Sequence, residues 1–133
     1  MIGGKILTAS ALSSWFDGSV YMAALVGVAK RKVIPLHVPT LALVQALDAL
    51  SERRLEAVAA RLDAPVFTFG EVGRGVAEGV ARLTARWERE RLSTADAHVI
   101  WASAGYEGWP VVVSHGAEAW KTRLPGTPIE VVP

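Results

Sequence analysis

The sequence predicts an α/β fold, a three-layer arrangement in which a central, mostly parallel sheet of four to five strands is flanked by helices. Two observations predict it. Short, almost purely apolar runs such as Val111-Val112-Val113 are typical of strands buried on both faces. Longer segments with apolar residues at helical spacing alternate with these runs. With 133 residues, 51% of them hydrophobic, the chain is expected to form one domain, residues 1–133, around a single core.

Composition and charge restrict the class of protein. The formal net charge is only +1, so the chain lacks the basic excess of proteins that hold nucleic acid mainly by charge. It contains no cysteine, which excludes disulfides, thiolate metal sites and a cysteine nucleophile. The N-terminus shows no signal-peptide pattern, and no apolar run is long enough to cross a bilayer. These features predict a cytoplasmic protein without a membrane partner.

In the first part of the chain, capping residues and breaks predict the element boundaries. Ile6-Leu7 is a short apolar strand, and Ala9 to Asp17 follows it as a helix. Ser19 is a natural N-cap for a second helix, which ends at the basic triplet Lys30-Arg31-Lys32. Val33 to Val38 is apolar and β-branched enough for a strand. The prolines in and just after this segment predict that it lies at the edge of the sheet.

Two helices and a strand are expected next. Pro39 suits the first turn of a helix that runs through Leu47, and an amphipathic helix follows. Pro65 to Phe69 has high β-propensity, and the glycine-rich turn Gly70 to Gly75 then opens a further helix. Helical spacing predicts inward side chains in three helices of this half of the chain: Leu12, Trp15 and Phe16; Leu55, Val58, Ala59 and Leu62; and Val76, Val80, Leu83 and Trp87. In the helix after Pro39, Leu43, Leu47 and Leu50 share one face, and Leu41, Gln45 and Asp48 share another.

The stretch Leu92 to Trp101 organises the last part of the chain. Ser93 or Thr94 can cap a helix there, and Asp96 then falls in the first turn, where a carboxylate suits the helix dipole. The helix body through Tyr106 is apolar on several faces, so it should be among the most buried. The strand at 111–113, a helix at 115–121 and a strand at 129–132 complete the chain. The five tryptophans are expected in the core or at a dimer surface.

Three segments together resemble PIN domains, the small nucleases that include the ribonuclease toxins of bacterial toxin–antitoxin pairs. Lys5 to Leu12 resembles the first strand and its helix, and Thr94-Ala95-Asp96-Ala97 resembles the start of a later helix. Gly108 to Ser114 resembles the following strand. The resemblance extends over essentially the whole chain in the same order. It implies a homodimer and, by analogy with the toxins, an antitoxin-like or other protein partner, with RNA or a nucleotide as ligand.

The expected site lies at the carboxyl ends of the strands, where ligands gather in an open parallel sheet. Thr8 follows the first strand, Ser114 and His115 follow the fourth, and Asp96 begins a helix that can face the same edge. The resemblance places the helix of Gln45 over this edge. The predicted pocket therefore consists of Thr8, Ser10, Gln45, Asp96, Ser114 and His115.

PIN domains carry carboxylates in this pocket, which hold Mg²⁺ or Mn²⁺ for metal-assisted phosphodiester cleavage. By this resemblance, Thr8, Gln45 and His115 stand where the family has acids, and only Asp96 matches. The pocket thus loses about three negative charges, and a hard cation loses its oxygen ligands. We therefore expect no catalytic residue, no metal and no cofactor. The expected function is that of a pseudo-nuclease, a PIN-like protein that binds or regulates without cleaving.

Several alternatives remain open at this stage. An active Mg²⁺- or Mn²⁺-dependent ribonuclease could use Asp96, Asp48 and His115 as a displaced ligand set. Asp17 could substitute for a missing acid, and Asp96 with His115 offers two ligands to a softer metal such as zinc. Ser114-His115 could suggest a nucleophile and base, although no third member is evident. Finally, the turn Gly70 to Gly75 could hold a phosphate in an unrelated nucleotide-binding fold. His37 and His98 are expected to be packed residues outside any such site.

Overall fold

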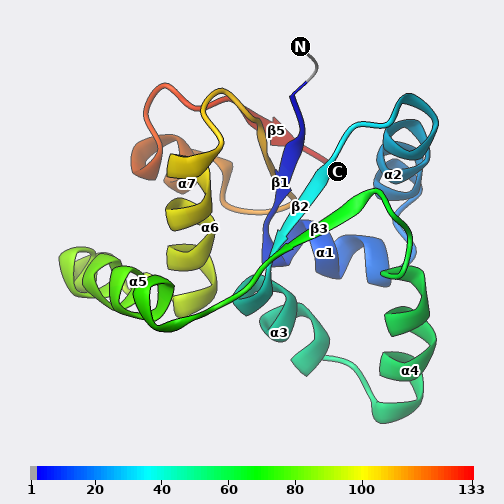
Figure 1. Ribbon diagram of the computed structural model, residues 1–133, viewed down its shortest axis with the longest axis horizontal. Helices are drawn as coiled ribbons and strands as arrows, with labels where there is room; N and C mark the ends of the chain where they lie inside the picture. Colours follow the sequence, from blue (N-terminus) through cyan, green and yellow to red (C-terminus); the bar gives the residue numbers. More distant parts are fainter. Residues whose placement is uncertain (1–2) are drawn as a thin grey trace.

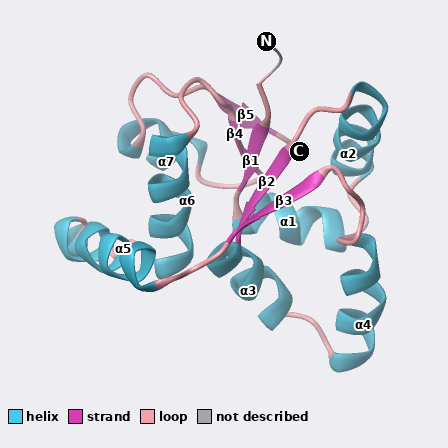
Figure 2. Cartoon of the chain, viewed as in Figure 1, coloured by secondary structure: helices cyan, strands magenta, loops and turns pink. Residues whose placement is uncertain are grey.

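The computed structural model describes residues 3–133, and at their centre is one five-stranded sheet whose strands are all parallel (Figure 1). The strands lie in the order β3-β2-β1-β4-β5. Helices surround this sheet (Figure 2), so the predicted three-layer α/β fold is confirmed. The strand bounds are β1 Lys5–Leu7, β2 Leu36–Pro39, β3 Phe67–Gly70, β4 Val111–Val113 and β5 Ile129–Val131.

The chain winds outward from the middle of the sheet in both directions. It starts in β1, adds β2 and β3 on one side, and then crosses to the other side to form β4 and β5. The direction of winding reverses between β1 and β4, which pair directly through Ile6 with Val111 and Leu7 with Val112. Such a reversal leaves a crevice at the carboxyl ends of the two strands. This topology therefore places the predicted pocket beside Thr8 and Ser114.

Seven helices flank the sheet within residues 3–133. Figure 1 shows α1, α2 and α4 on one side of the sheet and α5, α6 and α7 on the other, while α3 lies across the end where the strands finish. There α3 packs against both α1 and α6. The helices are α1 Ala9–Phe16, α2 Val20–Lys32, α3 Thr40–Asp48, α4 Glu52–Arg61, α5 Arg74–Arg86, α6 Thr94–Gly105 and α7 Ala117–Arg123, with a 3-10 turn at Glu88–Glu90.

Local sequence signals explain where most of these helices begin. Ser19 accepts a hydrogen bond from the Met22 amide at 3.2 Å, and Ser93 accepts one from the Asp96 amide at 3.1 Å. Both caps satisfy amide groups that the first helical turn leaves without partners. The predicted starts of α2 and α6 are thus confirmed. Half of α6 is buried, as expected, through Ala95, Ala97, His98, Val99, Ala102 and Ser103.

The prediction that the second strand lies at the edge of the sheet is wrong. β2 lies between β1 and β3 and pairs with both. Its prolines do not interrupt the pairing, because Pro35 precedes the strand and Pro39 is its last residue. The amides between them are free to donate, and the Leu36 amide reaches the Val66 carbonyl at 2.9 Å. Position within the strand, rather than the presence of proline, therefore decided where the strand could pair.

Two other predictions differ from the structure: which residues of α4 are buried, and where the last helix begins. In α4, Val58 and Leu62 are buried, but Leu55 is 38% exposed and Ala59 is also exposed. This helix therefore touches the core along a narrower line than its apolar pattern indicates. The last helix begins at Ala117 rather than at 115 and continues to Arg123. The later start follows from Gly116, because its φ of 70° lies in the left-handed region and is incompatible with a right-handed helix.

The tryptophans divide between the core and the surface. Trp15 and Trp120 are 4% exposed and belong to the main core, whereas Trp101 on α6 is 41% exposed. The Trp101 ring lies directly over Gly79 on α5, which brings these two helices into close contact. Within the part of the chain that the structure describes, no helix combines the length and the apolar character needed to cross a membrane.

Candidate functional site

A hollow of about 260 Å³ lies at the carboxyl ends of β1 and β4, where the topology places a crevice. It contains five of the six predicted pocket residues: Thr8, Ser10, Gln45, Asp96 and His115. The sixth, Ser114, lies in a neighbouring polar hollow that also includes Asp17 and shares His115 with the first. The wall is completed by Ala9 on α1, by Gly116, and by Ala119, Trp120 and Arg123 on α7.

Thr8 forms the floor of this hollow and is fully used by the fold. It is 1% exposed, and its hydroxyl donates to the Val112 carbonyl at 2.7 Å. The same oxygen accepts from the Ala11 amide at 3.3 Å and so caps α1. One hydroxyl thereby joins β1, β4 and the start of α1. Thr8 stabilises the pocket and has no proton left to offer a ligand.

Ser10 holds the turn that follows β4. Its oxygen accepts hydrogen bonds from the Ser114 amide at 2.9 Å and the His115 amide at 3.4 Å. The oxygens of Ser10 and Thr8 are 3.2 Å apart. Since the Thr8 proton goes to Val112, the Ser10 hydroxyl donates to Thr8. Ser10 therefore positions His115 at the rim rather than acting on a ligand itself.

The only acidic side chain that lines the hollow is paired with a base. Asp96 occupies the first turn of α6, and its carboxylate lies 3.2 Å from a terminal nitrogen of Arg123, the last residue of α7. The two side chains are 25% and 15% exposed, respectively, so solvent screens this ion pair only partly. Burial raises the pKa of the Asp96 carboxyl above its ordinary value, while Arg123 acts to lower it. The guanidinium also lies 5.2 Å from the centre of the Trp120 ring, which helps to hold it in place.

The donor set does not fit a divalent metal of the Mg²⁺ or Mn²⁺ type. Such an ion needs several oxygen ligands, usually including more than one carboxylate in a site without bound phosphates. Asp48 is exposed and does not line the hollow, and Asp17 faces Arg54 at 3.6 Å. Across residues 3–133, no three histidine or acidic side chains come close enough together to hold a metal ion. The displaced ligand set of Asp96, Asp48 and His115 is therefore not assembled.

Two histidines lie inside the protein and serve its packing, as expected. His98 on α6 is 2% exposed, and its Nδ1 accepts from the Leu41 amide at 3.2 Å. It thereby supplies the cap that Pro39 cannot give to α3. His37 bonds the Thr68 hydroxyl at 2.9 Å and packs against the Tyr106 ring. Burial lowers the pKa of both imidazoles, and the proximity of His98 lowers that of His37 further.

The glycine-rich turn after β3 lies apart from this hollow. None of its residues lines the hollow, and Gly73 begins α5 without a side-chain cap. A β-carbon at Gly70 would lie 2.7 Å from Nε2 of His37, so that glycine is required for packing. The phosphate-binding interpretation of this turn therefore gains no support from its surroundings.

Arg123 is not among the predicted pocket residues, because the sequence pattern predicts that the last helix ends at Lys121. A helical spacing signal was present: Gly116, Ala119, Trp120 and Arg123 follow one another at intervals of three, one and three residues, which is one face of a helix.

No protein-family model matches this sequence, and a search of curated proteins returns no similar protein.

Proposed function

We propose that this chain is a PIN-like domain that has become a pseudo-nuclease, and that its pocket binds a phosphate group of RNA or a nucleotide without a metal and without cleavage. The parallel three-layer fold and the gathering of five of the six predicted residues in one hollow support this proposal. The resemblance of the sequence to PIN domains supplies the family. The chemistry is argued from the residues that line the hollow.

The Asp96–Arg123 ion pair carries the proposal. A guanidinium nitrogen of Arg123 lies 3.2 Å from one carboxylate oxygen of Asp96, so the acid that a divalent cation would need is already paired. The guanidinium neutralises Asp96, which removes the charge that would attract a metal ion. The resulting pocket has one acid, one permanent base and His115 among its ionisable lining residues. Its net charge is therefore zero or positive, whereas the family pattern would make it strongly negative.

Such a pocket suits a phosphate group. Arginine presents five N–H donors in a planar arrangement that matches phosphate oxygens. Only one hydrogen bond of Arg123 goes to Asp96. The Gln45 amide and the His115 ring lie along the same hollow and add donors at its rim. A phosphodiester held there would meet no metal-bound hydroxide, since the ligands that would generate one are not assembled.

The first experiment is a calorimetric titration with Mn²⁺ at neutral pH, followed by an RNA-cleavage assay in the same buffer. We expect no saturable metal binding up to millimolar concentration and no cleavage. A saturable Mn²⁺ site that disappears in Asp96→Asn, together with cleavage that disappears in the same variant, would overturn the proposal in favour of an active ribonuclease.

A second titration tests the ligand with inorganic phosphate and with a short 5′-phosphorylated RNA. We expect binding to be lost in Arg123→Gln and retained in Arg89→Gln, which removes the same charge from an exposed residue outside the hollow. Equal affinity in both variants would show that the hollow is not the binding site.

We further propose that the chain forms a homodimer, with an antitoxin-like protein as an alternative partner. Large apolar side chains that remain exposed in the single chain support an interface. Val20 and Tyr21, adjacent at the start of α2, are 79% and 62% exposed. Sedimentation equilibrium of the wild type and of Tyr21→Glu checks this, because a charge in a buried interface weakens association. A monomer at all concentrations would refute the dimer.

A further inference from the structure

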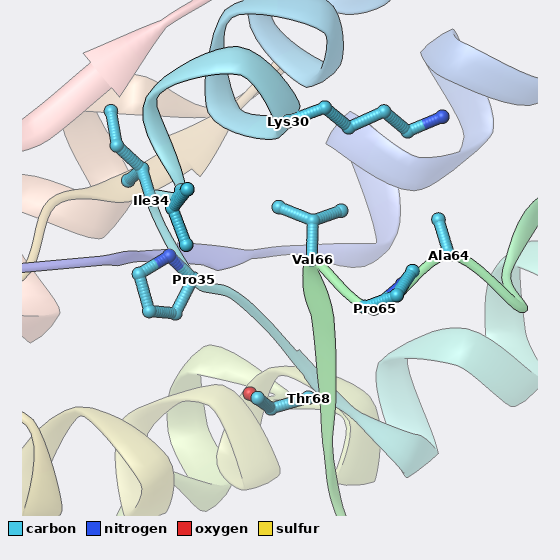
Figure 3. Close-up of a pocket in the computed structure, with 8 residues that line it drawn as sticks. Lys30, Ile34, Pro35, Ala64, Pro65, Val66 and Thr68 are labelled. Carbon is cyan, nitrogen blue, oxygen red and sulfur yellow. The ribbon is translucent and has the colours of Figure 1, made fainter.

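A larger hollow lies at the opposite end of the sheet from the candidate site, where the chain enters β2 and β3 (Figure 3). Its volume is about 470 Å³, within the range of small-molecule pockets. The segments before the two strands form most of its wall through Val33, Ile34, Pro35, Ala64, Pro65 and Val66. The side chains of these residues are all aliphatic, so the wall can pack against an alkyl chain.

One cation stands at this hollow. Figure 3 shows the Lys30 side chain reaching from α2 across the space above Val66 and Ala64. Lys30 is the only charged residue among those that line the hollow, and no acid faces it there. The remaining polar side chain, Thr68, already bonds His37 at 2.9 Å. The hollow therefore complements a molecule with an aliphatic body and a single negative charge.

Val33 provides an independent reason to look for a ligand here. Its φ of 54° places a β-branched residue in the left-handed region, where glycine is the usual choice. Its side chain is also 82% exposed. The turn after α2 needs only the backbone of this residue, whose amide bonds the Ala29 carbonyl. The backbone of Val33 is thus strained while its isopropyl group is in contact with water, and an apolar ligand in the hollow would cover that group.

We propose that this hollow binds a small aliphatic carboxylate. Its alkyl chain lies against Ile34, Pro35 and Val66, its carboxylate faces the Lys30 ammonium group, and Val33 closes over the chain at the rim. A concave space with one cation suits one chain and one charge, whereas a second protein copy would present a broader and flatter surface. The proposal does not depend on the phosphate pocket, which lies at the other end of the strands.

Octanoate is the test ligand, with octylammonium as a probe of equal chain length and opposite charge. Binding to the full chain is followed by calorimetry and by NMR shifts of the residues around the hollow. We expect saturable octanoate binding and much weaker octylammonium binding. Lys30→Glu should weaken octanoate about threefold to tenfold, as expected for reversing a solvent-exposed ion pair. Lys32→Glu makes the same charge change at a residue that does not line the hollow and should weaken binding much less than Lys30→Glu does.

Val33→Gly separates binding from folding. It relieves the left-handed strain, so the thermal midpoint of the free protein should rise, while the affinity for octanoate should fall. Three results would overturn the proposal: no saturable octanoate binding, equal binding of octylammonium, or a Val33→Gly variant that binds as well as the wild type. Sedimentation that shows a dimer broken by Lys30→Glu, without octanoate binding, would assign the hollow to a second copy instead. Arg123→Gln should leave octanoate binding intact, which keeps this test distinct from that of the phosphate pocket.

Discussion

Replacing Arg123 by glutamine tests whether the Asp96–Arg123 ion pair is the electrostatic centre of the hollow. The change leaves the Asp96 carboxylate, only 25% exposed, without its base. Breaking a fully buried pair destabilises by about 3–5 kcal/mol, and an exposed pair contributes about 0–1 kcal/mol. For this partly buried pair we expect a loss of about 2 kcal/mol at pH 7, measured by urea denaturation.

The pH dependence of this loss identifies its cause. Burial raises the pKa of Asp96 in the folded protein, and removing Arg123 raises it further because the favourable charge has gone. The folded state then binds a proton more readily than the unfolded state does. The destabilisation by the unpaired Asp96 carboxylate is therefore largest above the pKa that this carboxyl has in the folded protein, and it decreases as the pH falls through that pKa. We therefore expect the loss of stability in Arg123→Gln, relative to wild type, to become smaller as the pH is lowered from 7, which urea denaturation at a series of pH values measures.

A double-mutant cycle completes the test. Asp96→Asn combined with Arg123→Gln places two neutral amide groups in the same space, and the double variant should be more stable than the sum of the single losses predicts. We expect a coupling free energy of about 1–2 kcal/mol. A coupling below about 0.3 kcal/mol, or an Arg123→Gln loss that does not change with pH, would show that Arg123 acts through packing on Trp120 and not through Asp96.

The remaining predictions concern groups that hold the fold around the site. Thr8→Val keeps the volume but leaves the Val112 carbonyl without its hydroxyl partner, so unfolding should become easier by about 1–3 kcal/mol in urea; an unchanged midpoint would contradict the role given to Thr8. His37 and His98 have lowered pKa values when folded, so the unfolded state binds more protons and stability should fall as the pH drops below about 6.5. His98→Gln retains an acceptor for the Leu41 amide, and urea titrations from pH 7 to 5 should show a shallower slope in that variant. Gly79→Ala puts a β-carbon 2.1 Å from the Trp101 ring and should destabilise by about 1–3 kcal/mol, whereas Gly75→Ala, with open space around it, should not; equal midpoints would show that Trp101 moves freely.

Elements whose signals are local could be predicted from the sequence. Ser19 and Ser93 cap helices because a hydroxyl three residues before an unpaired amide can bond it whatever the rest of the chain does. Val111 to Val113 is apolar at every position, which is typical of a strand covered on both faces, and all three residues are fully buried. Such patterns sufficed for the α/β class, and the rule that ligands gather at the carboxyl ends of parallel strands then pointed to the ends of β1 and β4.

Features that depend on distant partners could not be predicted in this way. The central position of β2 depends on β3 joining its free side, and nothing in residues 33–38 specifies that neighbour. The exposure of Leu55 depends on how closely α4 approaches the core, which the apolar pattern of one helix does not determine.

The Asp96–Arg123 pair is the clearest case of this division. The sequence by itself determined that Asp96 lies in the first turn of a helix and that Thr8, Gln45 and His115, which line the same hollow, are not acids. Only the tertiary structure decided what Asp96 contacts, because Arg123 comes from another helix, and the left-handed turn at Gly116 sets where that helix starts and which face it presents. A carboxylate has the same chemistry in any sequence, but whether it meets a metal, water or a guanidinium depends on which side chains the fold brings to it, and here the end of α7 brings Arg123 to the first turn of α6.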